Sequence, residues 1–178
     1  MRKKNYIAGN HGAPCTTELK IKPRLEFQRP DDIHIFGYMA DRRDVTRSKA
    51  FKENWPDLTV EFPLIERGLT KVACRSIVAN MGLREPVTYS WGLPCANCIP
   101  CCKATSPDYW ANIRHHAPEE FNRMADLCES LPGRRQPIKL TRINNERITI
   151  REIPADWPMS KPDQPECDFL CQLAEQED

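Results

Sequence analysis

The stretch DIHIFGYMADRRDVTRSKAFKENWPDLTVEFPLI, residues 32–65, contains two short apolar runs separated by a strongly charged segment. The first run, residues 32–38, carries Ile33 and Ile35 and is bounded by an aspartate-rich turn on one side and by Gly37 near its end. A short apolar run between turn residues is typical of a strand inside a protein. We therefore expect a buried β-strand here.

A helix and a second strand are expected to follow. The charged segment, residues 41–54, places its few apolar side chains near helical offsets and predicts a surface helix. Residues 58–65 predict a second strand, and Thr70 is placed to cap a further helix that Gly82 ends. Strands joined by a helical crossover pair in parallel. The sequence thus predicts an α/β protein with a fragment of a parallel sheet and crossover helices.

The rest of the chain is less regular. Glycine, proline and cysteine dominate residues 89–103 and predict a Cys-rich loop. Helices are expected to begin at Pro107 and at Pro118, because proline suits the first helical position. Beyond them we expect a small hairpin with strands at 138–140 and 147–153 around Asn144-Asn145, and an extended tail over residues 155–178.

Composition sets the broad class. A chain of 178 residues suffices for one domain with a substantial core, and we expect a single domain over residues 1–178. Its 26 Lys and Arg residues balance 25 Asp and Glu, so net charge gives no reason to expect a polyanion or a membrane surface as partner. No apolar run approaches the roughly 20 residues of a membrane span, and no signal peptide is evident. We expect a soluble, cytoplasmic protein.

Nine cysteines are many for a reducing compartment, where they favour metal binding or redox chemistry over structural disulfides. The densest cluster is LPCANCIPCC, residues 93–102, with overlapping Cys-x-x-Cys pairs at Cys95, Cys98 and Cys101. This spacing lets two thiolates bind one ion, and thiolates favour zinc or an iron–sulfur cluster. A closed site needs four ligands, so we expect further ones from among Cys15, Cys74, Cys128, Cys167 and Cys171.

These further cysteines differ in their surroundings. Cys74 and Cys128 lie at helical spacing from apolar residues and are expected in the core, because a free cysteine behaves as a small hydrophobe. Cys15 precedes Thr-Thr-Glu, which indicates a helix start, where the helix dipole would stabilise a thiolate. Cys167 and Cys171 are either ligands or an accidental pair in the tail.

Several segments together carry a family resemblance. The most specific is NCIPCCK, residues 97–103, followed by Tyr109-Trp110 and Pro118-Glu119. The others are PCTTELKIKP at 14–23, a Gly, acidic and Arg segment at 36–47, FPLIERGLT at 62–70 and CDFLC at 167–171. In this order they resemble the phosphoadenosine-phosphosulfate reductase family, in particular the variants carried by bacteriophages. The similarity runs from about residue 10 to the end of the sequence.

The resemblance implies a metal site. In members of the family with an iron–sulfur cluster, cysteines equivalent to Cys15, Cys98 and Cys101 converge on it. Cys171 is taken as the fourth ligand, and Cys167 and Cys74 are the other options. The expected cofactor is an iron–sulfur cluster, with zinc as the alternative.

The resemblance also implies a substrate site. Lys20, Arg43 and Arg47 resemble positions that face the anionic substrate, an adenylated sulfonucleotide, and cations of this kind pair well with sulfate or phosphate. Ordinary solvated charge is the alternative for all three.

The sequence departs from the family in two places. It has no Ser-Gly-Gly-x-Asp-Ser pyrophosphate loop, whose backbone donors would hold nucleotide phosphate, and it starts roughly where the nucleotide-binding half is expected to end. The family's Glu-Cys-Gly-Leu-His tail is absent too, and Pro100 and Cys102 stand where the family motif has Gly and Val. Catalysis would therefore need a separate nucleotide-binding half.

Two functions remain open. The chain is either the cluster-bearing part of an enzyme of sulfonucleotide reduction or sulfur transfer, or a metal-stabilised phage module that binds a host protein or nucleic acid without catalysis. A pyrophosphate-loop partner would favour the first function, and stoichiometric capture of a host partner the second.

Overall fold

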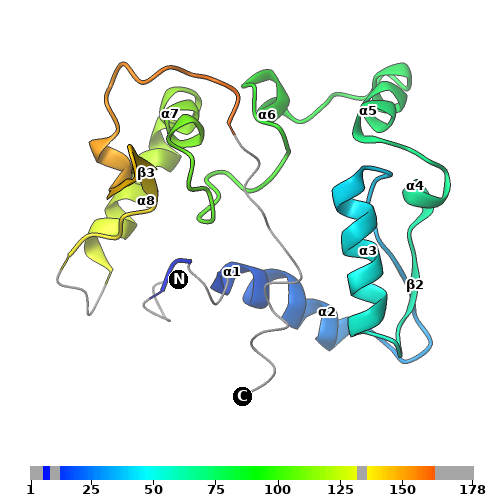
Figure 1. The fold of residues 1–178 in the computed structure, drawn as a ribbon. Coiled ribbons are helices and arrows are strands. Elements are labelled where there is room, and N and C mark those ends of the chain that lie inside the picture. The colour runs from blue at the N-terminus through cyan, green and yellow to red at the C-terminus, as the bar shows by residue number, and fades with distance from the viewer. Residues whose placement is uncertain (1–5, 9–12, 132–135, 163–178) are drawn as a thin grey trace. The chain divides into compact units, whose positions relative to one another are not determined.

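The structure is a computed structural model that describes residues 6–8, 13–131 and 136–162 (Figure 1). It has a mixed α/β fold with a parallel strand pair, a Cys-rich segment, helices and an antiparallel hairpin, which confirms the predicted fold class. The chain divides into two compact units, one made of Met1–Glu18 and Pro86–Asp168, the other of Leu19–Glu85 and Phe169–Asp178. The expectation of one domain over residues 1–178 stays a prediction.

The second unit contains the predicted strand–helix–strand segment. Strand β1 (Ile33–Ile35) leads into helix α3 (Arg42–Asn54), and strand β2 (Thr59–Glu61) follows. The strands pair in parallel, with Ile33 opposite Thr59 and Ile35 opposite Glu61. The second strand is shorter than predicted, because Pro63 begins the one-turn helix α4 (Pro63–Glu66).

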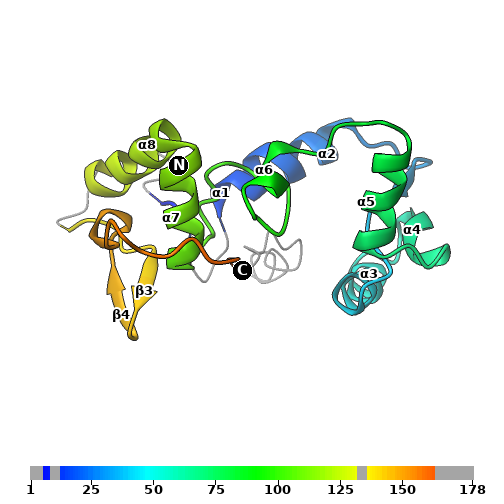
Figure 2. The same cartoon turned by 90° about the horizontal axis from the view of Figure 1, so that it is seen from above.

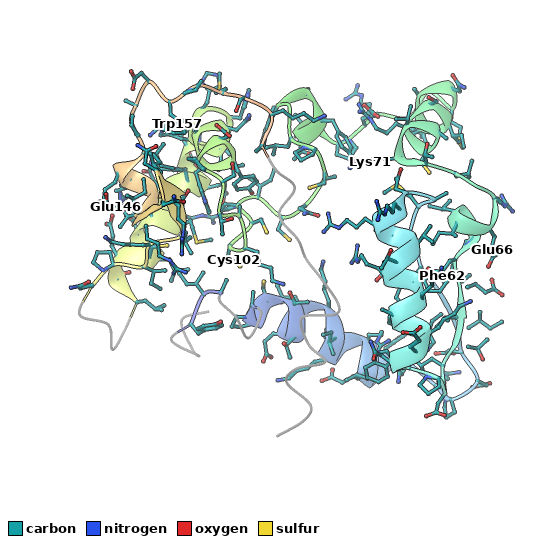
Figure 3. All side chains as sticks on the ribbon, in the orientation of Figure 1. Phe62, Glu66, Lys71, Cys102, Glu146 and Trp157 are labelled. Carbon is teal, nitrogen blue, oxygen red and sulfur yellow. The ribbon has the colours of Figure 1, made fainter. Side chains whose placement is uncertain are left out.

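An aromatic cluster holds this segment together. The Phe36 ring lies 4.6 Å from that of Phe51 and 5.6 Å from that of Phe62, measured between centroids. Phe51 comes from α3 and is 1% exposed, while Phe62 follows β2 and is 3% exposed (Figure 3). Buried aromatic pairs of this kind contribute both apolar burial and ring contacts. The helix is thus fixed on the strands by residues next to the strands rather than within them.

The expectation that β1 is buried is wrong. Ile33 is 56% exposed and Ile35 is 67% exposed. Alternate residues of a strand point to one face, so both isoleucines share the face opposite His34. Among the described residues, no element buries that face of the strand pair.

Helix α5 (Lys71–Asn80) begins and ends as predicted. The Thr70 hydroxyl accepts a hydrogen bond from the Ala73 N–H at 3.3 Å, and Gly82 has a φ of +68° just beyond the helix. Cys74 on this helix is only partly buried, so its expected place in the core is wrong. The helix meets too little of the rest of its unit to bury any side chain fully.

The first unit is built on two helices. Helices α7 (Pro107–His116) and α8 (Pro118–Ser130) begin at the predicted prolines and lie side by side (Figures 1 and 2). Their shared core includes Trp110 and Ile113, which are both 0% exposed. Cys128 is 2% exposed in the same core, which confirms its predicted burial. Shorter helical elements of this unit are α1 (Pro14–Thr16) and α6 (Val87–Ser90). A π-helical turn (Thr17–Ile21) leads from α1 into α2 (Lys22–Phe27), which belongs to the second unit.

The hairpin turns where the sequence predicted. Asn144 and Asn145 have φ values of 51° and 66°, and the strands are β3 (Thr141–Ile143) and β4 (Glu146–Ile148). The predicted first strand, 138–140, is wrong, and the second, 147–153, is right only at residues 147–148, because a two-residue turn with two positive φ values places the paired residues directly beside it. A 3₁₀ turn (Ile150–Glu152) replaces the end of the second predicted strand.

The segment after the hairpin returns to α7. The Arg114 guanidinium donates to the carbonyl oxygens of Ile153 at 2.8 Å and of Pro154 at 2.6 Å. Trp157 Nε1 donates to the Asp108 carboxylate at 2.8 Å. The predicted extended tail is thus held against α7 in its described part, and residues 163–178 lie outside the described residues. Within the described residues, no helix is long and apolar enough to cross a membrane.

Candidate metal centre

The Cys-rich segment joins α6 to α7 in the first unit and contributes to its core. Cys95 and Cys101 are each 8% exposed and Cys102 is 3% exposed, whereas Cys98 is exposed. Figure 3 marks Cys102 in this irregular stretch. The structure has no disulfide among the described cysteines, which are Cys15, Cys74, Cys95, Cys98, Cys101, Cys102 and Cys128.

Tyr109 holds the two ends of the Cys98-x-x-Cys101 turn. Its hydroxyl accepts a hydrogen bond from the Cys101 N–H at 2.7 Å and donates one to the Cys98 carbonyl oxygen at 3.3 Å. Tyr109 lies in the first turn of α7 and is 3% exposed, so a regular helix fixes the phenol that organises an irregular loop. Burial raises the pKa of Tyr109, and the nearby thiols of Cys101, Cys95 and Cys98 raise it further. The phenol therefore stays neutral and keeps its donor.

The far end of the segment is fixed to the same helix. The Ala104 N–H donates to the Cys101 carbonyl oxygen at 3.0 Å and closes a tight turn. Trp110 Nε1 donates to the Ala104 carbonyl oxygen at 2.9 Å. Tyr109 and Trp110, the pair that follows the cysteine motif in sequence, thus place Cys101 and Cys102 against the first turn of α7.

Cys15 lies against this segment from a distant part of the chain. Its Sγ is 3.6 Å from Cys102 Sγ, across a separation of 87 residues. Cys15 is half-buried in α1, which begins at Pro14, two residues before the Thr-Thr-Glu segment that predicted a helix start. Burial raises the pKa of the Cys102 thiol, and the neighbouring Cys15 and Cys101 raise it further. A metal cation would reverse this preference by stabilising the thiolates.

The thiol pair fits one edge of a tetrahedral metal site. With a Zn–S distance of about 2.3 Å, two sulfurs on one tetrahedral ion lie about 3.8 Å apart. The Cys15–Cys102 separation of 3.6 Å is close to that value. In the described part of the chain, no group of three or more His, Cys, Asp or Glu side chains is arranged to hold an ion. The donor chemistry and one edge therefore fit, and a complete ligand set is not formed by these residues as they stand.

The predicted ligands are only partly brought together. Cys15 meets the Cys-rich segment, but its contact is Cys102, which stands where the family motif has Val and was not among the predicted ligands. Backbone groups of Cys98 and Cys101 both form hydrogen bonds with the Tyr109 hydroxyl. Cys171 and its alternative Cys167 lie outside the described residues, and Cys74 belongs to the second unit. The position of Cys102 directly after Cys101 was the signal that could have drawn attention to it.

The predicted substrate-binding cations all belong to the second unit. Arg43 and Arg47 lie four residues apart on α3 and so share a face of that helix, while Lys20 is exposed in the π-helical turn. Arg47 pairs with Asp44 at 3.0 Å and lies over the Tyr38 ring at 4.7 Å. These contacts give Arg47 a structural role, and the anion-binding role of the three cations stays a prediction.

Comparisons of the chain with protein-family models, with curated proteins and with solved structures find no match.

Proposed function

We propose that this chain is the cysteine-bearing part of a phosphoadenosine-phosphosulfate-reductase-like protein and that it holds an iron–sulfur cluster, with zinc as the alternative metal. One observation supports this most: Cys15 Sγ lies 3.6 Å from Cys102 Sγ, so the two segments that the resemblance implies at one metal centre meet in one unit.

In this proposal Cys15, Cys98, Cys101 and Cys171 hold the metal. The bound metal would stabilise the thiolate form of its ligands and, as an iron–sulfur cluster, would supply electron-transfer capacity. The chain's own contribution is to orient the ligands: Tyr109 fixes the backbone on both sides of the Cys98-x-x-Cys101 turn. Described cysteines without disulfide bonds suit a reducing cytoplasm, where we place the protein.

The proposed substrate is an adenylated sulfonucleotide, held by Lys20, Arg43 and Arg47. Guanidinium and ammonium groups suit sulfate and phosphate oxygens. The sequence contains no Ser-Gly-Gly-x-Asp-Ser loop, so a nucleotide-binding half has to come from elsewhere. The reaction class is sulfonucleotide reduction or sulfur transfer, and it depends on that second half.

Anaerobic purification of the full chain tests the metal. We expect broad visible absorption with bound iron and sulfide, or a colourless protein with bound zinc. Cys15→Ser, Cys98→Ser and Cys101→Ser should each lower the metal content. Cys128→Ala is the matched control, because Cys128 packs in the core of the same unit between α8 and its neighbours. A purified wild-type protein without iron or zinc, which also takes up neither on reconstitution, would sink the proposal.

A non-catalytic binding module is the second candidate. The exposure of Ile33 and Ile35 on one face of the strand pair favours it, since exposed apolar faces often contact partners. Activity restored by adding a separate nucleotide-binding protein would favour the enzyme. Stoichiometric binding of a host protein or nucleic acid, with no activity on mixing, would favour the module.

A further inference from the structure

The Cys15–Cys102 pair has a geometry that suits a second chemistry. The two sulfurs are 3.6 Å apart within one unit, and a disulfide needs an S–S distance of about 2.05 Å. Each sulfur can swing about its own Cα–Cβ bond, so a rotation of the two side chains can close a gap of about 1.5 Å without moving a helix.

The two thiols also differ in accessibility. Cys102 is 3% exposed, while Cys15 is half-buried at the start of α1. A dissolved reagent can therefore reach Cys15 and cannot easily reach Cys102. In such a pair, the accessible thiol can react with a disulfide oxidant to form a mixed disulfide, and the protected thiol next to it can then displace the remaining half of the oxidant.

We propose that Cys15 and Cys102 form a reversible disulfide in exchange with a small-molecule disulfide such as oxidised glutathione. The Cys15 thiolate attacks one sulfur of the reagent, forms a mixed disulfide and releases the first small thiol. Cys102 then loses its proton, its Sγ attacks Cys15 Sγ and the mixed disulfide bond breaks. The leaving small thiolate takes up a proton and departs as the second small thiol. The cysteines lose two electrons and two protons, and these convert the reagent into two thiols.

This chemistry regulates the proposed metal centre, and that consequence rests on the proposed function. A sulfur in a disulfide is no longer a thiolate ligand, so Cys15 cannot bind metal while it is bonded to Cys102. Oxidation should therefore release the metal, and reduction should restore binding. Metal in turn should protect Cys15 from the reagent.

The test uses the full chain made metal-free with a chelator. The reduced protein is equilibrated with oxidised and reduced glutathione in graded ratios, free thiols are alkylated, and tryptic peptides are analysed by mass spectrometry. Trypsin leaves Cys15 as the only cysteine in peptide 5–20, while peptide 85–103 holds Cys95, Cys98, Cys101 and Cys102. We expect the two peptides to become linked, with fragmentation placing the bond at Cys102 in most of the linked material.

Two variants sharpen the outcome. Cys102→Ser should abolish the link and leave Cys15 as a stable mixed disulfide with glutathione. Cys95→Ser, which changes a buried cysteine of the same peptide, should still form it. The inference is overturned if wild-type Cys15 stays alkylated or mixed with glutathione at every ratio, or if its bond falls mainly on another cysteine.

Failure of this inference can be told apart from failure of the proposed function. A chain that forms the link but never binds iron or zinc supports the disulfide and removes the metal centre. A chain that binds metal but forms no link keeps the metal centre and removes the disulfide. The wild-type measurement decides between these outcomes even if Cys102→Ser folds poorly.

Discussion

Tyr109→Phe removes one oxygen and keeps the ring, so it measures what the phenol hydroxyl contributes to the Cys98-x-x-Cys101 turn. The hydroxyl is the acceptor for the Cys101 N–H at 2.7 Å, in a buried position. A buried donor left without its acceptor costs about 1–3 kcal/mol. The bond to the Cys98 carbonyl oxygen is longer, 3.3 Å, and only partly buried, so water can replace most of it. We expect a loss of about 2 kcal/mol in the free energy of unfolding.

Urea denaturation of the reduced, metal-free chain, followed by tryptophan fluorescence, measures this loss. Tyr109→Leu is the companion variant, because it also removes the ring that meets Trp110 edge-on at 5.3 Å between centroids. It should destabilise more than Tyr109→Phe. A Tyr109→Phe protein that unfolds within about 0.5 kcal/mol of wild type would refute the role given to the hydroxyl.

Two further predictions concern the hairpin and the core. Since Asn145 has a φ of 66°, Asn145→Val should lower the free energy of unfolding by about 1–2 kcal/mol, measured by thermal or urea unfolding. Asn145→Gly should be neutral or stabilising. Equal effects of the two substitutions would contradict a left-handed conformation at this position. Burial raises the pKa of Cys128 from 9.0 to about 11, so the folded state holds its proton longer than the unfolded state. The free energy of unfolding should therefore be unaffected by this group below pH 9.0 and should fall by about 2–3 kcal/mol as the pH rises through about 11. Cys128→Ala should lack this part of the fall. Plots of unfolding free energy against pH that run parallel for the two proteins would contradict the prediction.

Local patterns in the sequence predicted much of the fold. The strand–helix–strand order from residue 32 to residue 65 was predicted because each element has its own periodicity and its own boundary residues. Pro107 and Pro118 located α7 and α8 for the same reason. The exposure of Ile33 and Ile35 could not be predicted, because it depends on whether another element covers their face of the sheet and not on the strand itself.

At the candidate site, too, contacts between distant parts of the chain could not be predicted from local sequence. Spacing predicted a metal site at the Cys-x-x-Cys pairs, and the family resemblance implied Cys15 as a further ligand, but the contact between Cys15 and Cys102 joins positions 87 residues apart. Nothing in either local sequence sets that distance. The role of Tyr109 was also missed, since its two hydrogen bonds go to backbone groups, which carry no signature of their own in a sequence.

The helical run from Pro14 to Phe27 crosses from one unit to the other between Glu18 and Leu19, inside its π-helical turn. Gene fusion and module exchange succeed where the junction is an exposed loop that can be cut without breaking backbone hydrogen bonds. A junction placed here would leave amide and carbonyl groups of a helix without their partners. We therefore expect the two units to be inherited, expressed and lost together rather than shuffled as independent modules.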